Sequence, residues 1–214
     1  ADDEAGILML AAVEGTALSR LLDRPGAEGS LAVVGAALRR FHLARVLVDR
    51  PRSHDGAAEA RVLGGWLDRL APHEPKLHAR CAAAARPLLG SLAELARARA
   101  VLLHRDLHDK QVFVGRGDQV ALIDLDTLTA GDPAVDLANL AGHLELRALQ
   151  GGRDVASVAR LRAALLDGYG LAAEDLARLQ VFEDAVRLRL ACVYAFRPRW
   201  PGIASALGAL AERD

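Results

Sequence analysis

The sequence predicts an α+β fold that is mainly α, in which a small β-hairpin insert interrupts a series of amphipathic helices. Helical periodicity covers most of the chain, whereas short β-type apolar runs occur near its middle. Apolar residues make up 52% of the chain and charged residues 26%, which is ordinary for a globular protein and sufficient for a core. We therefore expect one large helical domain with a small β element inside it.

The first part of the chain is predicted to be a hinge or connector, residues 1–15, followed by two helices. Thr16 is expected to cap a short helix that ends near Leu22, and Ser30 to cap a longer one. Asp132 is expected to cap a later helix that starts at Pro133. Besides the first two, the helical patterns with Gly or Pro at their breaks cover residues 57–70, 75–98, 133–150, 155–168, 172–196 and 201–212.

Three short apolar runs, 101–103, 112–114 and 120–123, are typical of β-strands, and residues 115–118 resemble a hairpin turn. The segment HRDLHDKQ at 104–111 separates the first two runs. A packed core gains nothing from so many ionisable groups in one loop, so these residues are expected to be functional.

Composition argues against several other classes of protein. The 27 Lys and Arg residues nearly balance the 28 Asp and Glu residues, so no global field favours nucleic acid or an anionic membrane. No signal peptide and no apolar stretch of about 20 residues is present. Cys81 and Cys192 lie far apart in helical patterns and are predicted to be buried thiols. A cytoplasmic protein with no membrane or nucleic-acid partner is the expectation.

Three motifs occur in a fixed order: HRDLHDKQ at 104–111, IDLD at 123–126 and GDPAVDLA at 131–138. Together they resemble the aminoglycoside phosphotransferase and choline kinase branch of the protein-kinase-like fold. The resemblance covers most of the chain from about residue 7 to 150, more weakly upstream of the motifs. It implies a kinase C-terminal (large) lobe at 16–214, with a catalytic segment at 101–136.

The activity implied by this resemblance is ATP-dependent transfer of a phosphoryl group to a hydroxyl of a small molecule, with Mg²⁺ and ATP bound. Asp106 would orient the hydroxyl and accept its proton, and Lys110 would neutralise the transferring phosphate. Asp124 would hold Mg²⁺. Gln111 stands where the family usually has Asn as second metal ligand, and it offers the same amide oxygen on a longer arm.

The resemblance also implies supporting roles. His104 would support the loop by hydrogen bonding, and His108 would be structural or close to the substrate. Arg105 replaces the small residue of most aminoglycoside kinases, so the sequence does not point to an antibiotic substrate. Asp126 is either a ligand contact or a turn former, and Asp136 is expected to bond the backbone of the catalytic loop.

A complete kinase of this type also has a small N-terminal lobe with a nucleotide-covering loop and a phosphate-binding lysine. Nothing that could form it precedes residue 7, so the chain is predicted to lack the N-lobe and to bind nucleotide poorly by itself. Two alternatives remain open: a non-catalytic, kinase-derived binding module, and a metal-dependent hydrolase that uses His104, Asp106 and His108.

Substrate identity is open at this stage. Four arginines follow the catalytic region near two aromatic residues; they are Arg187, Arg189, Arg197 and Arg199, near Tyr194 and Trp200. They form either a solvated helix face or part of a substrate pocket. The second case would favour a neutral or anionic hydroxyl compound, such as a sugar derivative, over a polycationic antibiotic.

Overall fold

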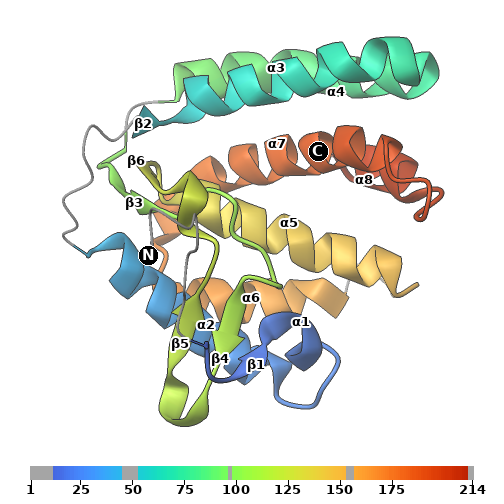
Figure 1. Ribbon diagram of the computed structural model, residues 1–214. Coiled ribbons are helices and arrows are strands. Elements are labelled where there is room, and N and C mark those ends of the chain that lie inside the picture. Colours follow the sequence, from blue (N-terminus) through green and yellow to red (C-terminus); the bar gives the residue numbers. More distant parts are fainter. Residues whose placement is uncertain (1–11, 45–52, 96–97, 153–156, 212–214) are drawn as a thin grey trace, which may run out of the picture.

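A computed structural model describes residues 12–44, 53–95, 98–152 and 157–211 (Figure 1). Most of the predicted hinge or connector, residues 1–15, lies outside these residues. The helices are α1 Leu18–Leu21, α2 Ala27–His42, α3 Gly56–His73, α4 Pro75–Glu94, α5 Ala134–Gln150, α6 Val158–Tyr169, α7 Leu176–Ala195 and α8 Ile203–Ala211. The mainly helical α+β prediction is confirmed.

Helix α5 is the centre of the core. Most of its residues are buried, because α6 and α7 pack against it from different sides (Figure 1). Helices α3 and α4 form an antiparallel pair that packs on α7, and α2 packs along α6. None of the described helices is long and apolar enough to cross a membrane. Cys81 and Cys192 are free and buried, as predicted.

Two small sheets lie at one end of the helices (Figure 1). The first has the order β1-β4-β5, from Thr16–Ala17, Val112–Val114 and Val120–Leu122. Strands β4 and β5 form the predicted antiparallel hairpin, with Phe113 opposite Ala121. The second has the order β2-β6-β3, from Ser53–His54, Thr129–Gly131 and Val101–Leu103. Its strands β2 and β6 were not predicted, because their residues do not form the short apolar runs that mark β3, β4 and β5 in the sequence.

Two predicted helix caps were wrong. Thr16 lies in β1 opposite Val114, and α1 begins after it at Leu18. Helix α2 begins at Ala27, before Ser30, because Gly26 takes a left-handed φ of 87° and turns the chain into the helix one turn early. Helix α4 also ends at Glu94, four residues before the predicted end. The cap position of α5 is Pro133, one residue after Asp132, but the Asp132 carboxylate accepts a 3.0 Å hydrogen bond from the backbone N–H of Ala134, the first residue of the helix.

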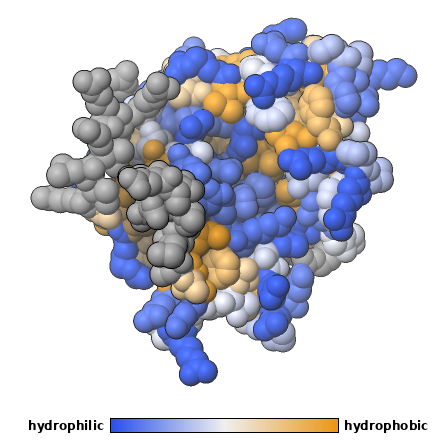
Figure 2. Space-filling view, viewed as in Figure 1, coloured by the Kyte–Doolittle hydropathy of each residue, from blue (hydrophilic) through white to orange (hydrophobic). Residues whose placement is uncertain are grey.

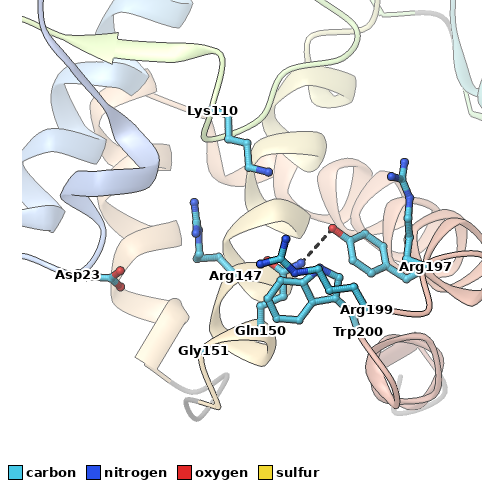
Figure 3. Close-up of a pocket in the computed structure, with 9 residues that line it drawn as sticks. Asp23, Lys110, Arg147, Gln150, Gly151, Arg197, Arg199 and Trp200 are labelled. Carbon is cyan, nitrogen blue, oxygen red and sulfur yellow. Dashed lines mark hydrogen bonds between the residues drawn. The ribbon is translucent and has the colours of Figure 1, made fainter.

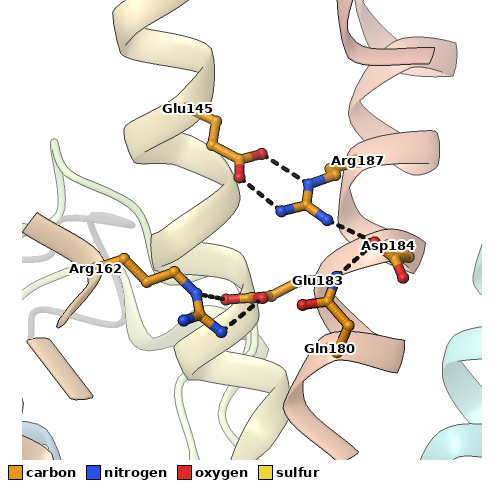
Figure 4. Close-up of polar contacts among 6 residues, drawn as sticks. All are labelled: Glu145, Arg162, Gln180, Glu183, Asp184 and Arg187. Carbon is orange, nitrogen blue, oxygen red and sulfur yellow. Dashed lines mark hydrogen bonds and ion pairs between the residues drawn. The ribbon is translucent and has the colours of Figure 1, made fainter. Parts of the chain in front are cut away.

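Ion pairs with buried carboxylates join the central helices (Figure 4). Glu145 of α5 accepts two hydrogen bonds from Arg187 of α7, at 2.9 and 2.7 Å. Arg187 also bonds Asp184, and these carboxylates outweigh burial and raise the pKa of Arg187 further. Arg162 of α6 pairs with Glu183 of α7 at 2.6 Å. Because each guanidinium is held by carboxylates, these contacts fix helix register.

Candidate active site

The segment 104–111 connects β3 of one sheet to β4 of the other, so it bridges the two sheets. Leu107 is completely buried and anchors the middle of the segment in the core. Arg105, Asp106 and Lys110 are exposed on either side of this anchor. A buried leucine between polar residues therefore presents the charged side chains outward.

Asp136, at the start of α5, holds the beginning of the loop. Its carboxylate is completely buried and accepts hydrogen bonds from the backbone N–H groups of His104, at 2.8 Å, and Arg105, at 2.7 Å. This is the backbone contact that the sequence predicts for Asp136. His42 lies 3.1 Å from the same carboxylate through Nε2, and its Nδ1 lies 2.9 Å from the Tyr169 hydroxyl.

Arg105 has a φ of 71°, in the left-handed region that side-chain-bearing residues rarely adopt. Its backbone N–H is held by Asp136 and its carbonyl accepts a 2.6 Å bond from the Asn139 amide. Arg189 donates to the Asn139 side-chain oxygen and lies 3.4 Å from Glu59. Contacts from α5, α7 and α3 thus hold a strained residue immediately before Asp106.

His104 links this loop to the segment that carries Asp124. Its Nε2 donates to the carbonyl of Ile123 at 2.9 Å, and its own carbonyl accepts a 2.7 Å bond from Thr127. These bonds match the supporting contacts predicted for His104. Two hydrogen bonds therefore connect the motif at 104–111 directly to the segment 123–127. One is donated by the His104 ring and the other by the Thr127 hydroxyl.

Gln111 and Asp124 form a polar pair. The side-chain amide nitrogen of Gln111 donates to the Asp124 carboxylate at 3.1 Å, and the backbone N–H of Ile123 donates to the backbone carbonyl of Gln111 at 3.0 Å. Asp124 has a left-handed φ of 64°. The side-chain oxygen of Gln111 is buried and has no hydrogen-bond partner among the residues that the structure describes, and an orphaned acceptor of this kind needs an explanation.

An amide oxygen and a carboxylate fit Mg²⁺, which prefers hard oxygen ligands and binds through one or two carboxylates and substrate phosphates. The Gln111 amide nitrogen faces Asp124. Because an amide has nearly the same shape with its oxygen and nitrogen exchanged, a flipped Gln111 would turn its oxygen towards Asp124, and that oxygen and the carboxylate could then share a cation. In the described part of the chain, no cluster of three His, Cys, Asp or Glu residues could hold a metal ion. The arrangement therefore lacks the ligand cluster that the hydrolase alternative needs.

Asp106 lines a cavity of about 350 Å³ between the loop, α5 and α7, together with His108, Lys110, His143 and Arg189. The rings of His108 and His143 lie 5.0 Å apart. Burial lowers the pKa of His108, although Asp106 acts in the opposite direction. Burial, followed by His108, lowers the pKa of His143 to about 3. Both rings are therefore neutral near pH 7, so the two imidazoles add no positive charge beside Asp106 that would repel a cation.

Asp109 and Arg147 close the base of the site. One carboxylate oxygen of buried Asp109 accepts bonds from two nitrogens of Arg147, at 3.0 and 2.7 Å. The sequence does not assign an individual role to either residue. Asp109 lies in the segment 104–111 that is expected to be functional, whereas no sequence motif points to Arg147, near the end of α5.

A larger cavity of about 600 Å³ adjoins the first and shares Lys110, Arg147, Gln150, Tyr194 and Arg197 with it (Figure 3). Its remaining described lining residues are Asp23, Gly151, Arg199 and Trp200. Hydrophilic residues gather across the hollowed middle of the face seen in Figure 2. The four arginines of the sequence hypothesis thus separate: Arg197 and Arg199 line this cavity, Arg189 lines the smaller one, and Arg187 is held in ion pairs.

The structure does not bring every predicted site residue to one cavity. Neither Gln111 nor Asp124 is among the residues that line the cavity around Asp106. Asp126 is exposed in the single turn Leu125–Thr127, which fits the turn-former alternative. The predicted roles of these residues in ligand binding stay predictions.

Comparison with known proteins places this geometry in context. The model of a family described as "Phosphotransferase enzyme family" matches residues 2–182. A choline/ethanolamine kinase family protein from Mesorhizobium loti is 16% identical with a TM-score of 0.64, over 95% of this chain and 67% of that one. An aminoglycoside phosphotransferase from Streptomyces rimosus, solved with ADP and streptomycin, is 22% identical with a TM-score of 0.54, over 82% and 68%.

A glucosamine kinase, solved with glucosamine, ADP and inorganic phosphate, is 21% identical with a TM-score of 0.62. The match covers 91% of this chain and 55% of that kinase, so the chain spans little more than half of its length. A search of curated proteins found no match. At these identities the solved structures establish the fold alone.

Proposed function

Because the chain belongs to the phosphotransferase enzyme family, we propose that it forms the catalytic lobe of an ATP-dependent kinase that phosphorylates a hydroxyl group of a small molecule. The observation that carries this proposal is the position of Asp106. It faces a cavity beside Lys110, on a loop that Asp136 and Asn139 hold by its backbone. Phosphoryl transfer depends mainly on positioning and on fixed charge, and this loop offers both.

In the proposed reaction, Asp106 orients the acceptor hydroxyl and takes its proton as the oxygen attacks the γ-phosphorus of ATP; the bond from that phosphorus to the bridging oxygen breaks, and ADP leaves with the electron pair. Lys110, exposed at the mouth of the same cavity, balances negative charge on the transferring group. Asp124 and Gln111 would hold Mg²⁺ through a carboxylate and an amide oxygen. When bound, Mg²⁺ supplies charge neutralisation at the nucleotide phosphates.

Support for a nucleotide co-substrate comes from relatives of the same fold. The streptomycin-bound phosphotransferase and the glucosamine kinase were both solved with ADP. We assign no nucleotide-binding N-lobe among the described residues. The test therefore uses the full-length protein, including any segments that flank these residues. The activity of that whole protein is part of the proposal.

The test is replacement of Asp106 by Asn, with ADP release measured against a panel of hydroxylated metabolites in the presence of Mg²⁺. Loss of a general base is expected to lower kcat by about 10²- to 10⁴-fold. Asp118→Asn is the matched control, because Asp118 is exposed in the hairpin turn, away from the cavity. Unchanged biological activity in Asp106→Asn would favour the binding-module alternative, and equal loss in both variants would contradict the role of Asp106.

A further inference from the structure

The larger cavity has an unusual balance of charge. Four of its nine described lining residues are cationic, and Asp23 is the one acidic residue among those nine. Lys110 reaches into the cavity from the catalytic loop, while Arg199 lies against Trp200, with its guanidinium 5.6 Å from the ring centroid (Figure 3). The cations come from separate parts of the chain, so they are not one solvated helix face.

Most of this positive charge has no ion-pair partner within the described part of the chain. Arg147 is paired with Asp109, but Lys110, Arg197 and Arg199 have no ion-pair partner among the described residues. Acidic residues elsewhere on α7 are occupied, since Glu183 and Asp184 hold other arginines. A negatively charged ligand would meet three available cations here, whereas a polycation would be repelled.

The cavity also offers neutral recognition groups. Gln150 donates a 3.0 Å hydrogen bond to the Tyr194 hydroxyl, which leaves the Gln150 amide oxygen and the remaining hydroxyl valence for polar ligand groups. Trp200 is partly exposed at the wall, and an aromatic face of this kind packs against the apolar face of a ring. This combination suits a hydroxylated ring more than a simple inorganic anion.

We infer that the acceptor substrate is an anionic polyol, a hydroxylated compound bearing a carboxylate or phosphate, whose anion binds Arg197 and Arg199 while its hydroxyl reaches towards Asp106. The inference rests on the proposed function, because it takes the two adjoining cavities as one acceptor site. It also sets this chain apart from its amine-binding relatives of the same fold, which were solved with streptomycin and glucosamine.

The experiment compares sugars that share one ring but differ in charge. Binding of glucose 6-phosphate, glucuronate, glucose and glucosamine to the protein is measured by isothermal titration at low ionic strength, without nucleotide. We expect the two anions to bind more tightly than glucose, and glucosamine to bind least. Raising the salt concentration should reduce this difference, since the arginines are exposed.

The variant Arg197→Gln/Arg199→Gln should weaken anion binding by about three- to tenfold for each charge removed and leave glucose binding nearly unchanged. Arg160→Gln is the matched control, because Arg160 is also exposed but pairs with Glu28 on α2 at 3.5 Å. This variant should keep the full preference for anions.

Any of the following results would overturn the inference: tighter binding of glucosamine than of the anions, no saturable binding of either anion, or equal effects of the double variant and Arg160→Gln. Displacement of glucuronate by ADP would also overturn it, because the cavity would then be a nucleotide-phosphate site. These measurements require no phosphoryl transfer. A failure of the kinase proposal in the Asp106→Asn assay would therefore appear separately from a failure of the anion preference.

Discussion

Replacing Asp136 by Asn tests whether this buried carboxylate holds the catalytic loop. Its Oδ1 accepts from Arg105 N–H at 2.7 Å, and its Oδ2 accepts from His104 N–H at 2.8 Å and faces His42 at 3.1 Å. An asparagine that keeps its oxygen at the Oδ2 position turns an NH₂ group towards the Arg105 N–H. One charge-assisted bond is lost and one partly buried donor is left unsatisfied, which costs about 2–4 kcal/mol.

The loss should appear as a lower urea midpoint with an unchanged m-value, followed by far-UV circular dichroism. A loss of this size is a large fraction of the roughly 5–15 kcal/mol by which domains are stable. Asp118→Asn is again the control: this residue is exposed with a φ of 60°, which Asn tolerates, so its effect should stay within about 0.5 kcal/mol. If Asp136→Asn changes the free energy of unfolding by no more than about 0.5 kcal/mol, the reasoning is refuted.

A second variant separates loop strain from other losses. Arg105 holds its φ of 71° against a left-handed penalty of about 1–2 kcal/mol, which glycine does not have. Adding Arg105→Gly to Asp136→Asn should therefore recover about 1 kcal/mol of stability. No recovery in the double variant would mean that the loss arises elsewhere than at the Arg105 backbone.

Three further predictions concern packing and pH. Gly35→Ala should lower the free energy of unfolding by about 2 kcal/mol or more, because a Cβ there would lie 2.2 Å from the backbone oxygen of Leu165 at the contact of α2 with α6; a stabilising effect in urea denaturation would contradict this. Gly65→Ala, exposed in mid-α3 with open space around it, should instead raise stability by about 0.5–1 kcal/mol, and a loss in the same measurement would refute the open-space argument. The pKa of His143 is lowered by burial from 6.5 to about 3, so the folded state binds fewer protons than the unfolded one; stability is fully present above pH 6.5 and falls by up to a few kcal/mol as pH drops towards 3. His143→Gln should flatten this part of the pH–stability curve, and an unchanged slope would exclude His143 as its cause.

Local sequence features predicted most of the helices and the β-hairpin of this protein. Amphipathic periodicity predicts the helices, because each must bury one face, and the turn at Gly115–Asp118 predicts the β4–β5 hairpin. The bonds of Asp136 to the loop backbone follow from its place in a motif. The caps at Thr16 and Ser30 were wrong because the preceding glycine geometry and a strand pairing decide where those helices begin.

Only the tertiary structure decided which distant side chains meet. Asn139 and Arg189 are separated by fifty positions along the chain. The Asn139 amide nevertheless donates to the Arg105 carbonyl, and Arg189 donates to the side-chain oxygen of Asn139. Arg147 reaches Asp109, while Arg187 is occupied by Glu145. Sequence pattern records which face of a helix is buried but not which residue of another helix lies opposite, because that depends on how all the helices pack together. For the same reason, the charge of the cavity beside Trp200 became apparent only once the chain was folded.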